Sequence, residues 1–166
     1  AILDNEKKKT SPGDFDVFKQ TVAHEMFHCF TAWNFSTHWH AAFNGGYDVL
    51  DWWIEGAAEY FSNVVYPVTN DEWFRASSWN FNSATKSVVF MDYDNFGFFQ
   101  YLGNTLGDNA LLALLATTPT DGDELAQAGA LAAHPGMEGI FHDYARAFMD
   151  GTIQDSAGSG IYLPTT

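Results

Sequence analysis

The sequence is poor in three kinds of feature, and each scarcity excludes a class of protein. Cys29 is the single cysteine among 166 residues, so an internal disulfide cannot form. Only 7 basic residues stand against 21 acidic ones, which gives a net charge of −14. Nucleic acid and anionic membranes are therefore poor partners. No apolar run reaches the roughly 18 residues that would predict a membrane-spanning helix.

The composition predicts one globular domain. Apolar residues make up 46% of the chain and aromatic residues 17%, which is enough to build a core. We expect this domain over residues 1–150 and a mobile tail over residues 151–166, where Gly, Ser, Thr and Pro are frequent. The chain opens at Ala1 without a charged-then-apolar leader, so we expect a mature product or a fragment. The acidic composition favours a secreted protein.

The strongest motif is His24-Glu25-Met26-Phe27-His28, the pattern HExxH. Two histidines four residues apart on a helix lie on one face, so both imidazoles can bind one metal ion. Zinc suits such a site, because it accepts imidazole nitrogen and carboxylate oxygen and leaves one position open for water. Glu25 is placed to exchange a proton with that water. Histidines that are only packed or hydrogen-bonded are the alternative.

The residues around this motif predict a helix. Residues 15–23 contain no Gly or Pro. Apolar side chains recur at intervals of three and four residues, which predicts an apolar stripe along the helix: Phe15, Phe18, Val22, Met26 and Cys29. We interpret Cys29 as a small buried residue of this helix and not as a metal ligand.

A second helix is predicted from Asp51, ending before Pro67, and it carries Glu55, 27 positions after His28. Its stretch Trp52–Tyr60 reads W-x-x-E-G-x-A-E-Y. Together with HExxH, this stretch resembles the gluzincin zinc peptidases, nearest to bacterial collagenases and aminopeptidase-like enzymes. The resemblance covers residues 15–66 well and 90–116 loosely.

This resemblance implies a mainly α fold, the helical part of a gluzincin catalytic domain, with little or no β-sheet in this chain. A β-sheet subdomain upstream of the HExxH helix is usual in the family. Only 23 residues precede His24, so such a sheet either was cut away or belongs to another part of a longer protein.

The resemblance also assigns the site. The Zn²⁺ ligands would be His24, His28 and Glu55, with Glu25 as general base and acid in the hydrolysis of a peptide or protein substrate. Glu59, one turn after Glu55, would accept a hydrogen bond from the outer nitrogen of His24 or His28. Tyr93 would donate to the carbonyl oxygen in the transition state.

Several alternatives remain open at this stage. Tyr101 is the second candidate for the oxyanion donor. Asp4 would support an aminopeptidase, since it could bind a substrate amine. A third alternative is a non-catalytic zinc-stabilised fragment or interaction domain. The remaining histidines are interpreted as structural, those at 38 and 40 in a loop near the rim of the cleft and the others far from the motifs: His38, His40, His134 and His142.

Overall fold

The structure is a computed structural model that describes residues 12–45, 50–121 and 123–161. This part of the chain contains helices and turns but no strand, apart from an isolated bridge between Gln154 and Gly160. The expectation of a mainly α fold is confirmed. The helices are α2 (Pro12–Asn34), α3 (Ser36–Gly45), α4 (Asp51–Val65), η1 (Asp71–Arg75), α5 (Ala76–Asn82), η2 (Val88–Phe90), η3 (Tyr93–Asn95), α6 (Phe96–Leu106), α7 (Asp108–Leu115), α8 (Glu124–Ala133) and α9 (Met137–Met149).

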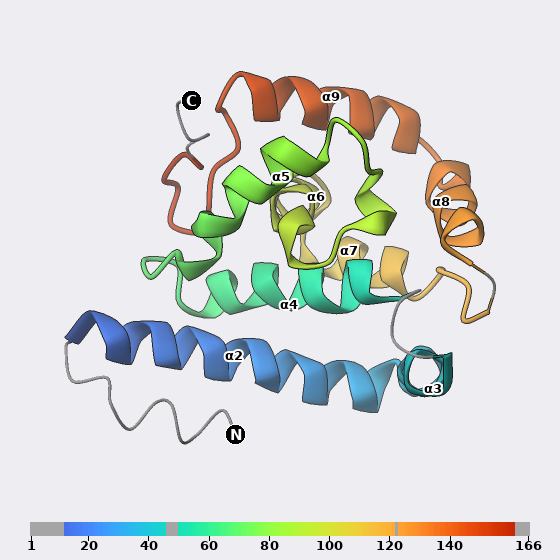
Figure 1. Cartoon of the computed structure of the whole chain (residues 1–166), viewed down its shortest axis with the longest axis horizontal. Helices are drawn as coiled ribbons and strands as arrows, with labels where there is room; N and C mark the ends of the chain where they lie inside the picture. Colours follow the sequence, from blue (N-terminus) through green and yellow to red (C-terminus); the bar gives the residue numbers. More distant parts are fainter. Residues whose placement is uncertain (1–11, 46–49, 122, 162–166) are drawn as a thin grey trace.

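Helices α2 and α4 carry the two motifs and lie side by side in opposite directions, with α3 between their ends (Figure 1). Phe27 of α2 stacks on Phe61 of α4, with ring centroids 4.5 Å apart and planes 15° from parallel. Gln20 of α2 donates to the hydroxyl of Ser62 on α4 at 3.2 Å. These contacts fix the position of the HExxH motif relative to the glutamate helix.

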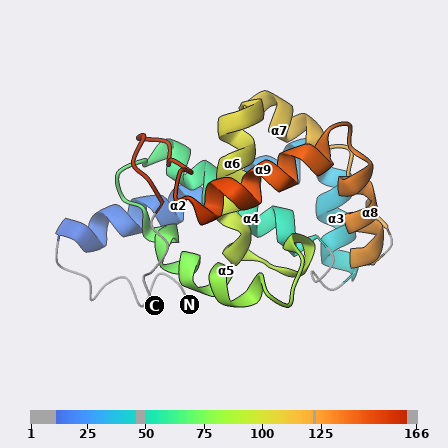
Figure 2. The same ribbon diagram turned by 90° about the horizontal axis from the view of Figure 1, so that it is seen from above.

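Helix α6 forms the centre of the rest of the molecule. It is seen end-on between α4 and α9 in Figure 1 and from the side in Figure 2. Its Phe98 and Phe99 are fully buried, and they contact Tyr144 of α9 and Trp52 of α4 respectively. Aromatic rings therefore form much of the core around α6.

Gly56, directly after Glu55, allows α6 and η3 to approach α4. The buried Asn95 donates to the carbonyl oxygen of Trp52 at 2.6 Å, and so joins η3 to α4. A Cβ atom at position 56 would lie 1.9 Å from Oδ1 of Asn95 and 2.6 Å from the ring of Phe99. The glycine of the glutamate helix is thus required by packing.

Replacing Gly56 by Ala should destabilise the fold by about 1–3 kcal/mol, because the new methyl group overlaps Asn95 and Phe99. Gly129→Ala in α8 is the matched control: a Cβ there meets nothing within 4 Å. That substitution should be neutral or stabilise by up to about 1 kcal/mol. Urea denaturation measures both. Equal stability of the two variants would contradict the packing argument.

Two expectations were wrong: one about the segment that links the motif helices, and one about Cys29 on the first of them. Residues 36–45, expected in a linking loop, form helix α3. Its His38 is buried and donates a hydrogen bond from Nε2 to the carbonyl oxygen of Thr118 at 2.7 Å, so it does not lie on a cleft rim. Cys29, expected to be buried, is exposed.

The segment after α9 also differs from the expectation of a mobile tail from residue 151 onward. Ile153, Asp155 and Ile161 are buried. Two hydrogen bonds attach the segment to the body: Ser156 N donates to Oδ1 of Asn63 at 3.0 Å, and Nδ2 of Asn104 donates to the carbonyl oxygen of residue 154 at 2.8 Å. Residues 151–161 therefore pack on the domain, and residues 162–166 lie outside the described part.

Within the described residues, no helix combines the length and apolarity needed to cross a membrane. This finding agrees with the short apolar runs of the sequence.

Candidate metal centre

Three side chains of the two motif helices converge on one point. Nε2 of His24 lies 3.0 Å from Nε2 of His28 and 3.1 Å from Oε2 of Glu55. The third side of this triangle, from Nε2 of His28 to the same oxygen, measures 3.4 Å. Among the described residues, these three form the one group of potential ligands arranged to hold a metal ion.

The size of the triangle fits a tetrahedral zinc ion. With bonds of about 2.0–2.1 Å to nitrogen and oxygen, two ligands of a tetrahedral zinc ion are separated by roughly 3.3 Å. The three observed separations of 3.0–3.4 Å bracket this value. The donor set of two imidazoles and one carboxylate leaves a fourth position open. The residues present therefore fit such an ion.

Glu55 is held in the charged form that a ligand needs. Burial alone would raise the pKa of this carboxyl group, but hydrogen bonds from His24 and His28 outweigh burial and lower the pKa to about 2. The carboxylate is therefore ionised at neutral pH, as a metal ligand must be.

Aromatic rings enclose the group on two sides. The ring of Tyr93 stacks on His24 with centroids 5.8 Å apart and planes 20° from parallel. Trp39 of α3 lies 5.9 Å from His28. Burial, and then the charge and hydrogen bond of Glu55, raise the pKa of the Tyr93 hydroxyl. This hydroxyl therefore stays protonated and able to donate.

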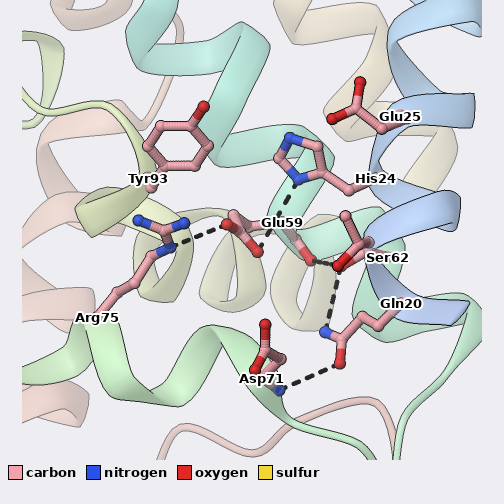
Figure 3. A pocket seen from close by; sticks show the side chains of 9 residues that line it. Gln20, His24, Glu25, Glu59, Ser62, Asp71, Arg75 and Tyr93 are labelled. Carbon is pink, nitrogen blue, oxygen red and sulfur yellow. Dashed lines mark hydrogen bonds and ion pairs between the residues drawn. The ribbon is translucent and has the colours of Figure 1, made fainter. Parts of the chain in front are cut away.

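An open pocket of about 200 Å³ lies beside the triangle. His24, Glu25 and Tyr93 are among its lining residues, and Figure 3 shows Glu25 and Tyr93 on either side of the His24 ring. Glu25 is exposed, so its carboxylate is accessible from this pocket. The structure brings the two proposed catalytic residues and the proposed ligands to one place.

Glu59 lies beside the outer nitrogen of His24, but the hydrogen bond predicted between them is not formed. Its Oε2 is 3.9 Å from Nδ1 of His24, beyond hydrogen-bond distance. Its other oxygen, Oε1, pairs with Nε of Arg75 at 2.9 Å. Nδ1 of His28 has no hydrogen-bond partner among the described residues. Burial of Glu59 excludes a surface role, and burial also raises its pKa, against the opposing charge of Arg75.

Sequence reasoning missed Arg75 and a buried network behind the pocket. In this network Gln20 of α2 and Asn63 of α4 both donate to the carboxylate of Glu72 on η1, the second at 2.7 Å. Oε1 of Gln20 also accepts from the backbone N–H of Asp71 at 3.1 Å. Only the rarity of basic residues could have drawn attention to Arg75 in advance.

The protonation of Glu72 should make stability depend on pH. Burial raises its pKa from 4.5 to about 7, against the hydrogen bond from Gln20. Between these values the unfolded chain releases the proton and the folded chain keeps it, so the free energy of unfolding falls as pH rises. The loss should reach about 3 kcal/mol above pH 7. Urea titrations from pH 4 to 8, with a chelator present, measure it.

Glu72→Gln should flatten this pH dependence, because the amide does not titrate. Glu138→Gln on the exposed side of α9 serves as the control and should leave the dependence unchanged. A Glu72→Gln variant with the wild-type pH dependence would refute the assignment.

The other candidates do not join the site. Tyr101 contacts Tyr144, with ring centroids 5.6 Å apart, and does not line the pocket. His142 is exposed on α9 beside Asp143. Asp4, on which the aminopeptidase alternative depends, lies outside the described residues.

Comparison with known proteins gives no further constraint: no family model, no curated protein and no solved structure matches the chain. The functional argument therefore depends on the geometry of the site.

Proposed function

We propose that the chain is a zinc-dependent peptidase of the gluzincin type. The observation that carries the proposal is the triangle of His24, His28 and Glu55, which has the dimensions of a zinc site and opens onto a pocket containing Glu25. Two adjacent helices present these residues in the order and spacing that the resemblance implies. A polar cluster that only stabilised the fold would not need an exposed carboxylate such as Glu25 in the pocket beside it.

Each residue then has a defined task. Bound between the three ligands, Zn²⁺ would polarise the substrate carbonyl and lower the pKa of a water molecule. Glu25 would serve as the base that takes a proton from the attacking water and as the acid that returns a proton to the leaving amine. The Tyr93 hydroxyl donates to the carbonyl oxygen, where negative charge develops. Trp39 and Tyr93 lie against the rings of His28 and His24 and so cover part of the site.

The uncovered face of α2 supports a further element of the proposal, an upstream β-sheet subdomain or other part of a longer protein. The side opposite the metal ligands carries exposed apolar side chains, with Trp33 86% exposed: Phe15, Val22, Met26, Phe30 and Trp33. In a longer natural chain, this face should become covered. The secreted location stays a prediction from composition.

A single experiment tests the function. The purified chain is loaded with zinc and incubated with a peptide library, half of it with acetylated amino termini, and the products are identified by mass spectrometry. We expect cleavage that a chelator abolishes and added zinc restores. Cleavage of free but not acetylated peptides would favour the aminopeptidase alternative. Zinc binding without cleavage of any peptide would favour the zinc-stabilised, non-catalytic alternative.

A further inference from the structure

Four side chains around the pocket contact one another in a closed ring (Figure 3). His24 lies 3.9 Å from Glu59, and Glu59 lies 2.9 Å from Nε of Arg75. The guanidinium carbon of Arg75 lies 4.0 Å from the ring centroid of Tyr93, and the ring of Tyr93 stacks on His24 at 5.8 Å. The four residues come from α2, α4, η1 and η3, so the ring joins four separate elements at the metal site.

Arg75 is the member that connects the two halves of this ring. Its Nε pairs with the buried carboxylate of Glu59, and its guanidinium group lies over the ring of Tyr93. The Phe74 ring, 4.6 Å from the same guanidinium carbon, adds a second contact. A guanidinium group can pair through its edge and stack through its face at once, which the ammonium group of lysine cannot do. Among the described residues, Arg75 is the only cation lining the pocket.

Without Arg75, both neighbours would lose their fixed positions. Glu59 is buried, and a buried carboxylate without a cation is costly, so it would turn towards water or take up a proton. The Tyr93 ring would lose the surface that holds it parallel to His24. Neither change removes a metal ligand, but each alters how a ligand or a donor is oriented.

We propose that Arg75 is a positioning residue of the zinc site: it holds the Glu59 carboxylate 3.9 Å from the outer nitrogen of His24, and it orients Tyr93, whose hydroxyl would donate to the reacting carbonyl. The inference rests on the proposed function for its second part only, since the first part concerns zinc binding alone. Arg75 acts through Glu59 and Tyr93 and makes no contact with the ion.

A double-mutant cycle on zinc affinity tests the first part. The dissociation constant for zinc is measured by competition with a fluorescent chelator in wild type, Arg75→Ala, Glu59→Gln and the double variant. Each single substitution should weaken binding by about 10-fold, because the negative charge of Glu59, 3.9 Å from Nδ1 of His24, favours the imidazole as a ligand. The double variant should bind zinc about as tightly as each single variant, because the two single substitutions remove the same interaction. Additive losses, or unchanged affinity in Arg75→Ala, would overturn the proposal.

Controls separate positioning from folding. Arg146→Ala removes an exposed arginine that also pairs with a carboxylate, Asp143, at 3.2 Å, and it should leave zinc affinity unchanged. If Arg75→Ala does not fold, Arg75→Lys serves instead, since it keeps the charge and loses the stacking. Substituted with Co²⁺, Arg75→Lys should show an altered visible absorption spectrum relative to Arg146→Ala. An identical spectrum and affinity would contradict the positioning role.

Kinetics test the second part. Arg75→Ala should lower kcat with little change in KM. When Tyr93→Phe is already present, adding Arg75→Ala should cause little further loss of kcat. Free guanidinium at millimolar concentration should restore part of the activity of Arg75→Ala. A raised KM with unchanged kcat would make Arg75 a substrate-binding residue and overturn the proposal. If no variant, wild type included, cleaves any peptide, the proposed function fails, and the zinc cycle still decides whether Arg75 positions Glu59.

Discussion

Replacing His28 by Ala is expected to abolish tight zinc binding. The imidazole supplies one corner of a triangle whose sides measure 3.0–3.4 Å, and no fourth histidine or carboxylate of the described residues belongs to that group. Loss of one of three protein ligands should weaken binding on the order of 10³-fold. Elemental analysis after dialysis should find one zinc per wild-type chain and none in the variant.

The matched control is His142→Ala. That histidine lies on α9 with 77% of its side chain exposed, so its loss should leave the zinc content unchanged. A variant at position 28 that retained zinc would show that the two Nε2 atoms approach each other for another reason. Wild-type protein without zinc under metal-replete conditions would remove the basis of the proposed function.

The same substitution should also change how zinc affects stability. A ligand that binds only the folded state stabilises it by about 4 kcal/mol when present at 1,000 times its dissociation constant. Excess zinc should therefore raise the melting temperature of the wild type and leave that of His28→Ala unchanged. Acidification should release the ion from the wild type, because protons compete with the metal for the imidazoles.

The local half of the site could be predicted from the sequence, because it depends on helical spacing alone. Residues four positions apart share a helix face, so HExxH brings His24 and His28 together, and Glu59 falls one turn after Glu55. The helix with Glu55 begins at Asp51 and ends at Val65, before Pro67, as expected. The convergence of Glu55 with the histidines followed from the resemblance and not from spacing.

The other half of the site lies on short segments, and hydrophobic periodicity in the sequence does not predict where such segments pack. Arg75 and Glu72 belong to a 3₁₀ helix that returns to the α2–α4 pair after a turn at Asn70, where the backbone is left-handed. Their partners Glu59 and Gln20 are 16 and 52 residues away. Glu72 accepts hydrogen bonds from two buried amides, Gln20 on α2 and Asn63 on α4, and nothing in the sequence marks these residues as partners.

Helix α2 illustrates a different limit. The apolar stripe that begins at Phe15 has helical spacing, and Cys29 on this stripe was predicted to be buried. In the structure Phe15, Val22, Met26 and Cys29 are exposed, whereas the buried face presents Gln20, His24 and Phe27. A helix that is apolar on two sides does not reveal from its period which side packs on this domain. The polar residues of the motif determine the choice, because their partners lie on α4.

Glu25→Gln is expected to remove most of the peptidase activity and to leave zinc in place. The amide keeps the size and shape of the carboxylate but cannot accept a proton, so the attacking water loses its base. Glu25 is not one of the three ligands, and its side chain is exposed at the pocket, so neither metal affinity nor melting temperature should change. The loss should fall on kcat, by about 10²–10⁴-fold, with KM nearly constant.

Glu124→Gln, remote on α8, is the matched control and should keep wild-type turnover. Turnover of Glu25→Gln within a few-fold of the wild type would show that another group moves the proton, and a parallel loss of zinc would show that Glu25 supports the metal instead.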